Sequence, residues 1–376
     1  MRVPVRSRIA VFVAVVQSIL FLAHAFLYKT WIAFWERPGA ADPPGISDLQ
    51  IALALLSVSF VAASFLAFRY SHIFVRLFYT ISAVWLGTLS FCFFAACLCW
   101  LLYGAILLLG VDVDRRPFAV ALFGLAVLAS VYGIVNAART RVKRITIKLP
   151  NLPESWRGRV AALVSDMHLG HVRNYRFARR IVSLLTRLRP DAVFITGDLY
   201  DGTAADLDRL AEPWTKLAAP LGAYFVTGNH EEFFDRTKYL DAVKRSGVRV
   251  LNNEKVILDG LQLVGVHYRD SVNPQRFRSI LQQAALDRDR ASILLTHAPH
   301  RLPIPEEEGI SLQLSGHTHG GQFVPYTWIT SRVYGPYVYG LKRFGNLMVY
   351  TSSGAGTWGP PLRVGTQPEI VLLRFE

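Results

Sequence analysis

Cysteine is scarce in this chain and absent from its second half. The three cysteines, Cys92, Cys97 and Cys99, all lie in one apolar run. Their spacing is not that of a metal site, so we expect them to be small buried hydrophobic side chains in a membrane helix. A soluble part without cysteine fits an oxidising and a reducing compartment equally well, and it excludes thiolate metal ligands there.

Charge is scarce in the first part of the chain. Nine Lys/Arg and five Asp/Glu precede residue 139, whereas 32 and 22 follow it. The 376 residues exceed what one compact domain needs, so we predict a transmembrane helical unit over 1–138, a basic linker over 139–154 and a soluble domain over 155–376. A basic soluble domain suits an anionic substrate or an anionic lipid surface, and general solubility charge is the alternative.

Two kinds of charge pattern are missing. No basic cluster interleaved with aromatic residues stands away from the membrane boundary, which argues against a nucleic-acid-binding protein. The apolar runs contain no carboxylate or paired charge that would mark an ion or substrate path, which argues against a transporter. A membrane receptor or transporter with a regulatory soluble domain remains the alternative from another functional class.

Four apolar runs are long enough to cross a bilayer, whose hydrocarbon core is about 30 Å thick. They are residues 9–28, 49–68, 77–110 and 118–138, and we interpret the long third run as one crossing. No small-residue cleavage signal follows the first run, which argues against a removed signal peptide. A loop rich in proline and glycine, Glu36–Ser47, separates the first two runs.

The distribution of positive charge predicts the orientation of this unit. With four crossings, both of its ends lie on one side, which would carry nine Lys/Arg in short flanking segments, whereas the other side would carry four. Since positive residues accumulate in such segments on the cytoplasmic side, we expect an integral, multi-pass membrane protein whose soluble domain faces the cytoplasm.

Five short strands are predicted in the soluble part, and each ends in polar residues close to glycine or histidine. Uninterrupted apolar runs of this length are typical of strands buried on both faces. The strands are residues 160–165, 192–196, 223–227, 292–296 and 311–315, and a helix is predicted over 174–188. A layered α/β fold follows, with the polar residues collected along one edge of the sheet.

The polar residues at the strand ends form a mixed ligand set of two carboxylates, one amide and four imidazoles. They are Asp166, His168, Asp198, Asn229, His297, His317 and His319. Such a set suits Mn²⁺, Fe or Zn²⁺ better than Ca²⁺ or Mg²⁺. Seven ligands exceed the needs of one ion and suit two divalent ions bridged by a carboxylate, which can activate a water and stabilise the oxygens at phosphorus.

Five motifs follow one another in a specific order. They are Asp166-Met167-His168, Gly197-Asp198, Gly228-Asn229-His230-Glu231, His297 and Gly316-His317-Thr318-His319. In this order they resemble the calcineurin-like metallophosphoesterase superfamily over roughly residues 155–376. The longer forms DMHLG and SGHTHGGQ are similar to the branch that carries an N-terminal membrane anchor or export signal. The resemblance implies a four-layer α/β/β/α sandwich, here preceded by an all-α transmembrane unit of about four helices.

The resemblance also implies roles for single residues. Six ligands divide into two sets of three, namely Asp166, His168 and His319 for the first ion and Asn229, His297 and His317 for the second. Asp198 would bridge the two ions. His230 would be the catalytic residue that protonates the leaving group or stabilises charge on the transferring phosphoryl group.

Further polar residues lie beside these ligands in the sequence. We expect Asp201 and Glu231 to orient histidines rather than to bind a metal ion. His171 is a candidate for contact with the substrate phosphate, and a surface histidine is the alternative. The aromatic run Tyr334–Gly340 is a candidate rim for the substrate. We assign no site role to the remaining histidines, His24, His72, His267 and His300.

Together these observations predict a membrane-anchored, metal-dependent phosphoesterase, either a phosphodiesterase or a pyrophosphatase. The membrane unit and the basic domain favour an amphiphilic or lipid-linked phosphorylated substrate, with membrane lipids as further partners and no nucleic acid. The alternatives are a general phosphodiesterase or nuclease of the same superfamily, and a scaffold without metal ions, which the complete ligand set disfavours. The oligomeric state is left open.

Overall fold

The computed structural model describes residues 5–35, 46–111, 113–233 and 235–376. The chain forms two compact units, Met1–Ile134 with Gly359–Leu362, and Val135–Trp358 with Arg363–Glu376. The loop predicted over Glu36–Ser47 lies outside the described residues, except for its last two positions.

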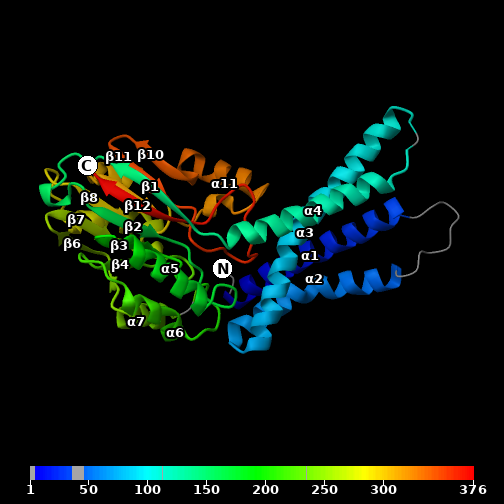
Figure 1. The fold of residues 1–376 in the computed structure, drawn as a ribbon, viewed down its shortest axis with the longest axis horizontal. Coiled ribbons are helices and arrows are strands. Elements are labelled where there is room, and N and C mark those ends of the chain that lie inside the picture. The colour runs from blue at the N-terminus through cyan, green and yellow to red at the C-terminus, as the bar shows by residue number, and fades with distance from the viewer. Residues whose placement is uncertain (1–4, 36–45, 112, 234) are drawn as a thin grey trace. The chain divides into compact units, whose positions relative to one another are not determined.

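Four long apolar helices account for most of the first unit (Figure 1). They are α1 Val5–Trp35, α2 Ile46–Arg69, α3 Ile73–Leu108 and α4 Arg116–Ala137. Their stretches long and apolar enough to cross a membrane are Ile9–Trp35, Ser47–Arg69, Ile73–Leu108 and Arg116–Ala137. The predicted number is confirmed for the described residues, and the long third run is one continuous helix. The first helix, however, continues beyond residue 28 to Trp35.

Small buried side chains and hydrogen-bonded polar groups lie where these helices pack against one another. Ala96 and Cys99 of α3 are fully buried, and Cys92 is buried as well. The prediction of small buried hydrophobic side chains thus holds for two of the three cysteines, whereas Cys97 is partly exposed. The indole of Trp85 in α3 donates to Nε2 of His24 in α1 at 2.8 Å. Because a polar group in hydrocarbon needs an internal partner, this contact gives His24 a structural role.

Two six-stranded sheets make up the described part of the second unit's β structure. The first has the order β1-β12-β2-β3-β4-β5 and the second the order β10-β11-β9-β8-β7-β6. The bounds of the first are β1 Arg141–Ile147, β12 Glu369–Phe375, β2 Val160–Val164, β3 Ala192–Thr196, β4 Ala223–Val226 and β5 Arg249–Val250. Those of the second are β10 Gly340–Phe344, β11 Leu347–Thr351, β9 Leu312–Ser315, β8 Ser292–Leu295, β7 Leu261–Gly265 and β6 Glu254–Leu258. The five predicted strands are thus β2, β3, β4, β8 and β9.

Short helices connect and cover these strands. The α-helices are α5 Tyr175–Leu188, α6 Leu207–Ala211, α7 Arg236–Arg245, α8 Tyr268–Val272, α9 Pro274–Gln283, α10 Pro303–Glu307 and α11 Tyr326–Tyr334. The 3₁₀ helices are η1 Glu154–Trp156, η2 Glu212–Lys216, η3 His319–Gly321 and η4 Gly335–Val338. The predicted helix is α5, which begins after Asn174 because that side chain accepts from the N–H group of Arg176 at 2.8 Å.

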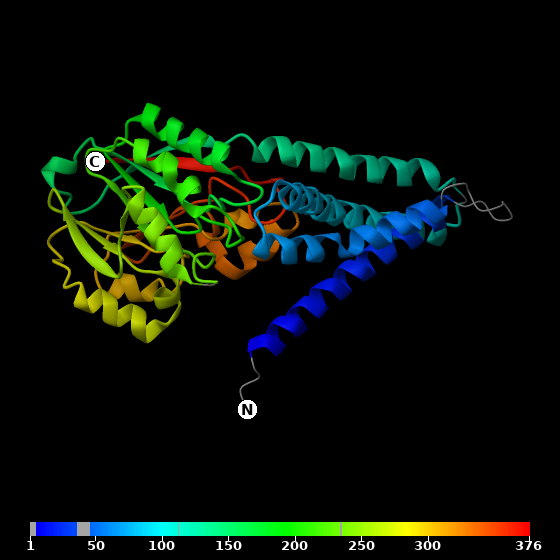
Figure 2. The same cartoon turned by 90° about the horizontal axis from the view of Figure 1, so that it is seen from below.

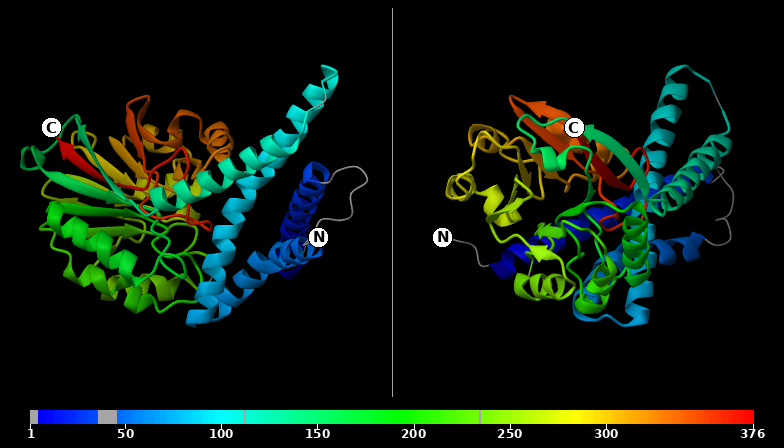
Figure 3. Two further views of the ribbon diagram at one scale, coloured as in Figure 1. Left: turned by 45° about the vertical axis from the view of Figure 1, so that its right-hand side comes forward. Right: turned by 60° about the vertical axis from the view of Figure 1, so that its left-hand side comes forward.

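Three buried clusters establish the order of the layers. Ile181 of α5 packs against one face of the first sheet, and Phe194 of β3 and Leu295 of β8 belong to the cluster between the sheets. Phe277 of α9 packs against the outer face of the second sheet. Figure 2 shows α5 and α9 on opposite sides of the strands, and Figure 3 shows the layers from two further directions. The predicted α/β/β/α sandwich is confirmed, and covering both faces of each sheet explains the uninterrupted apolar runs.

The segment over 139–154 is not a linker throughout. Its residues Arg141–Ile147 form β1, which pairs in parallel with β12 from Arg141 opposite Glu369 to Ile147 opposite Phe375. Arg141 and Arg144 stay exposed because β1 is an edge strand, where basic side chains are common. The prediction of a linker was therefore wrong for these residues, since their charge hides the strand pattern.

Candidate metal centre

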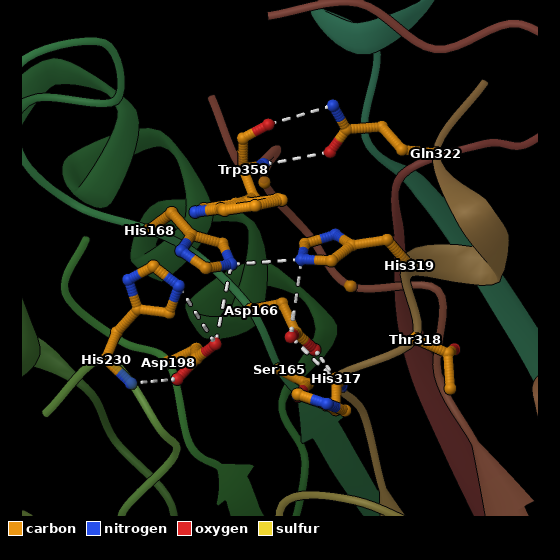
Figure 4. Close-up of polar contacts among 12 residues, drawn as sticks. Ser165, Asp166, His168, Asp198, His230, His317, Thr318, His319, Gln322 and Trp358 are labelled. Atoms are coloured by element: carbon orange, nitrogen blue, oxygen red, sulfur yellow. Dashed lines mark hydrogen bonds and ion pairs between the residues drawn. The ribbon is translucent and has the colours of Figure 1, made fainter. Parts of the chain in front are cut away.

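All seven candidate ligands lie in loops that follow strands of the two sheets. In chain order, Asp166 and His168 follow β2, Asp198 follows β3, Asn229 follows β4, His297 follows β8, and His317 and His319 follow β9. Parallel strands bring their carboxyl ends to one edge of a sheet, and here the two edges face each other. The structure brings the side chains of all seven residues together. Figure 4 shows Asp166, His168, Asp198, His317 and His319 among them.

Backbone strain is concentrated in these loops. The angle φ lies between 48° and 71° at Asp166, His168, Asp198, His317 and His319. This left-handed region costs residues with a Cβ atom about 1–3 kcal/mol each and persists only where packing enforces it. At Gly228 the packing is so close that a Cβ atom would overlap the carboxylate of Asp198. The loops are therefore held in a shape that directs the ligand side chains inward.

The first cluster of ligand atoms consists of Asp166, His168 and His319. The Nε2 atoms of His168 and His319 are 3.0 Å apart, and Nε2 of His319 is 3.5 Å from Oδ1 of Asp166. All three side chains are buried or nearly so. One cation at this point could contact two imidazoles and one carboxylate.

The second cluster is centred on Nε2 of His297. This atom is 3.1 Å from Oδ1 of Asn229, 3.0 Å from Nδ1 of His317 and 3.2 Å from Oδ2 of Asp198. Nδ1 of His297 lies 2.7 Å from the carbonyl oxygen of Thr196. Because a carbonyl oxygen can only accept, Nδ1 carries a proton and Nε2 faces the cluster.

Asp198 connects the two clusters. Its Oδ2 atom is 3.7 Å from Nε2 of His168 in the first cluster and 3.2 Å from Nε2 of His297 in the second. Its Oδ1 atom accepts from the N–H group of His230 at 3.0 Å, which fixes the carboxylate plane (Figure 4). One oxygen of this carboxylate is thus within reach of both groups of imidazoles.

Burial lowers the pKa of three of the four candidate imidazole ligands, and neighbouring carboxylates raise the pKa of the fourth. It lowers the pKa of His168 and His319 far below the ordinary value, and burial beside His297 lowers the pKa of His317 to about 3. For His297, burial lowers the pKa, but the carboxylates of Asp198 and Asp166 outweigh burial and raise it to about 9. The neutral imidazoles of His168 and His319, whose Nε2 atoms are 3.0 Å apart, form a donor set that fits a divalent cation.

His230 lies beside the clusters with one ring nitrogen fixed. Its Nδ1 atom donates to the carbonyl oxygen of Asp201 at 2.8 Å, since that oxygen can only accept. Its Nε2 atom, 3.9 Å from Oδ2 of Asp198, therefore faces the centre. The rings of His168 and Phe233 lie 4.6 Å and 4.5 Å from its ring, measured between centroids. A nitrogen held in this way can hold or release one proton at the centre.

The two acidic residues beside the ligands hold backbone groups. The Glu231 carboxylate accepts from the N–H groups of Asp198, Tyr200 and Gly228 at 3.0, 2.9 and 2.7 Å. Burial and the Asp198 carboxylate raise the pKa of Glu231 to about 8, although these N–H groups act in the opposite direction. Asp201 orients His230 through its carbonyl oxygen rather than its side chain. Glu231 thus orients two loops rather than a histidine ring.

His171 and His267 occupy different surroundings. His171 is only 3% exposed and its N–H group donates to Asp201, so it is not a surface histidine. Its contact with a substrate stays a prediction. His267 is fully buried, accepts from the N–H group of Thr227 at 3.1 Å and lies 3.1 Å from Oδ1 of Asn252. Both ring nitrogens of His267 thus contact loop residues, and we assign it no site role.

Sequence reasoning missed Arg363, a fully buried arginine at the centre. It donates to the carbonyl oxygen of His319 at 3.1 Å and lies 3.1 Å from Nδ1 of the same ring. Burial lowers the pKa of Arg363 to about 10, which leaves it charged at neutral pH. The guanidinium therefore fixes the His319 ring with Nε2 facing Asp166. No motif marks Arg363, since the ring that it orients, His319, lies 44 residues away in the chain.

Aromatic rings border the centre on two sides. On one side, the Tyr268 ring lies 5.7 Å from His297 and 5.6 Å from His317, and the Tyr334 ring lies 6.1 Å from His317. Beside His230, the exposed rings of Phe233 and Trp358 form another border. Of the predicted aromatic rim, Tyr334 is thus next to a candidate ligand, whereas sequence reasoning missed Tyr268, Phe233 and Trp358.

Comparison with known proteins agrees with this geometry. The family described as calcineurin-like phosphoesterase matches residues 160–321. A Danio rerio protein named "Transmembrane protein with metallophosphoesterase domain" is 31% identical over 96% of this chain and 87% of its own. An uncharacterized metallophosphoesterase of Campylobacter jejuni is 29% identical over 97% of this chain and 98% of its own. One of Aquifex aeolicus is 33% identical over 67% of this chain and 98% of its own.

The family match and the relatives, together with the sandwich fold and the His/Asp clusters, define a metal-dependent phosphoesterase with a site for divalent metal. The chain belongs to the calcineurin-like metallophosphoesterase family. Its four apolar helices, together with similarity over nearly the whole chain to a protein named as transmembrane, indicate membrane association.

Proposed function

We propose that the protein is a multi-pass membrane hydrolase that uses two divalent metal ions to cleave a phosphate ester or anhydride in an amphiphilic, lipid-linked substrate. The observation that carries the two-ion assignment is the position of Asp198, whose Oδ2 atom is within 3.7 Å of imidazole nitrogens from both clusters. Asp166, His168 and His319 would hold one ion, and Asn229, His297 and His317 the other. Mn, Fe or Zn suits this donor set.

When bound, the ions would supply the Lewis acidity that activates a water and neutralises charge at phosphorus. The chain's own residues provide a proton donor and hold the ligands in position. His230 presents Nε2 toward the centre and, when protonated, can donate to the leaving oxygen. Glu231 holds the loops of Asp198 and Asn229, and Arg363 holds the His319 ring.

The borders of the centre support an amphiphilic substrate. Phe233 and Trp358 are exposed although their rings lie 4.5 Å and 6.2 Å from that of His230. An apolar part of a substrate would cover such rings while its phosphate lies among the ligands. The membrane helices of the same chain keep it close to lipids, whose phosphorylated headgroups belong to this substrate class.

The soluble domain is proposed to face the cytoplasm. The flanking segments carry nine positive residues on one side and four on the other, and this bias favours the cytoplasm for the richer side. Cytoplasmic phospholipids and nucleotide-linked lipid precursors would then be the accessible substrates.

The test uses the full chain purified in detergent. We expect about two equivalents of Mn, Fe or Zn per chain by elemental analysis and hydrolysis of bis(4-nitrophenyl) phosphate that chelation abolishes and metal restores. A panel of phospholipids, lipid-linked diphosphates and free nucleotides follows, and we expect turnover of the lipid-linked members. Hydrolysis of the water-soluble members alone would refute the substrate class, and one ion per active chain would refute the two-ion site.

A further inference from the structure

The helix α11 carries its apolar side chains on the solvent side. Every residue of this helix is described, and none of them is buried. Trp328, Ile329 and Val333 are 70%, 60% and 71% exposed. The half-buried side chains are the small, polar Thr327 and Thr330 and the aromatic Tyr334 at the end of the helix. A helix on the surface of a soluble protein shows the opposite arrangement, because burial of apolar side chains holds it in place.

The exposed apolar residues form one continuous strip. At about 100° per residue, Trp328, Ile329 and Val333 lie within an arc of about 140° on the helix surface. Arg332 lies within the same arc and is also exposed. A strip of tryptophan and branched aliphatic side chains together with arginine is the composition of helices that lie in the interface between lipid headgroups and acyl chains.

Exposed basic residues of α11 and of the strand that follows it in the chain fit an anionic lipid surface. Lys342 and Arg343, in strand β10 directly after η4, are exposed like Arg332. Exposed basic side chains attract anionic headgroups. A bilayer is also within reach at all times, since four helices of the same chain are long and apolar enough to cross one.

The same helix is joined closely to the metal centre. Its last residue, Tyr334, lies 6.1 Å from the ring of His317 and stacks on His300 at 5.7 Å. At its other end, Gly321 of η3 approaches Thr327 so closely that a Cβ atom would overlap the Thr327 backbone. The position of α11 and that of the loop bearing His317 and His319 are therefore coupled.

We propose that α11 is an interfacial helix through which the catalytic domain docks on the bilayer, with Trp328, Ile329 and Val333 inserted below the headgroups. Docking in this way puts the Tyr334 border of the metal centre at headgroup level. The proposal concerns a surface of the domain, and it holds whichever phosphorylated compound the centre cleaves.

The test measures the depth of single positions in a bilayer. The full chain, with its native cysteines replaced by alanine, carries one nitroxide at position 328 or 333 and is reconstituted in phosphatidylcholine–phosphatidylglycerol nanodiscs. Power-saturation electron paramagnetic resonance compares collision with oxygen, which is enriched in lipid, and with a water-soluble nickel complex. Lys238 in α7, which is exposed and polar, supplies the control position. Hydrolysis of bis(4-nitrophenyl) phosphate reports that each labelled chain is folded.

We expect labels at 328 and 333 to collide several-fold more with oxygen, relative to the nickel complex, than the label at 238. Equal exposure of all three labels to the nickel complex would show that the strip faces water and would overturn the proposal. Immobile labels at 328 and 333 that neither reagent reaches would also overturn it, since the strip would then be packed against protein, either a second copy or other helices.

Discussion

Replacing Glu231 by alanine should loosen the two loops that carry Asp198 and Asn229. The buried carboxylate accepts from three N–H groups, those of Asp198, Tyr200 and Gly228. A buried donor that loses its acceptor costs about 1–3 kcal/mol. Three such losses amount to at least about 3 kcal/mol, a large share of the roughly 5–15 kcal/mol that holds a domain folded.

The variant Glu231→Gln separates the shape of this side chain from its hydrogen bonds. An amide keeps one acceptor oxygen and replaces the other by a donor group. If its oxygen takes the place of Oε2, the bonds from Asp198 and Gly228 remain, and the NH₂ group meets the N–H group of Tyr200. One of three bonds is lost, so the expected cost is about 1–3 kcal/mol.

Hydrogen exchange followed by mass spectrometry of the full chain in detergent measures this loosening directly. Peptides covering residues 196–201 and 226–231 should exchange faster by about 100-fold or more in the alanine variant and by about tenfold in the glutamine variant. Glu154→Ala makes the same chemical change at a side chain that is 87% exposed, and it should leave both peptides unchanged. Unchanged exchange in the Glu231→Ala chain, with normal metal content, would refute the reasoning.

Three further predictions concern the centre and the orientation. Asp198→Asn should lower turnover by several orders of magnitude, because two close cations need a shared anion, and a chain with normal turnover and two metal ions would remove Asp198 from this role. His230→Ala should lower kcat by about 10²–10⁴-fold with metal content unchanged; activity lost in proportion to metal would make His230 a ligand. The orientation is tested in a chain whose native cysteines are replaced. Arg144→Cys, on the exposed side of β1, should then resist a membrane-impermeant thiol reagent in intact cells, whereas Ser47→Cys should react. Labelling at position 144 would reverse the orientation.

The central strands could be predicted because each carries two independent signals. The run Ala192–Thr196 is apolar in its first four residues because it is covered on both faces, and it is followed at once by Gly197 and Asp198. Short runs rich in apolar residues, followed closely by Asp, Asn or His, mark β2, β4, β8 and β9 as well. Local sequence was therefore sufficient for the α/β class and for the seven candidate ligands.

The remaining parts depend on contacts between distant segments. β1 is rich in arginine and lysine, and only its pairing with β12 makes it a strand. Arg363 lies in an irregular loop, and its role follows from carbonyl oxygens of Ser353, Gly356 and His319 that fold around it. The ring of Tyr268 approaches His317 only because α8 follows β7 in the neighbouring part of the sheet. The decisive partners, β12 for β1, His319 for Arg363 and His317 for Tyr268, are distant in sequence, so no local pattern predicts these contacts.

The strand β12 lies between β1 and β2 and pairs with both, so the first sheet cannot form in full until Glu369–Phe375 has been made. While the ribosome makes the protein, β1 emerges long before its neighbour β12 exists. The four apolar helices are synthesised earlier still and are available for insertion before the domain can close. Insertion and closure are thus separated in time. A nascent chain that stalls before Glu369 would be anchored, yet it would lack the strand that supports β2 and the loop bearing Asp166.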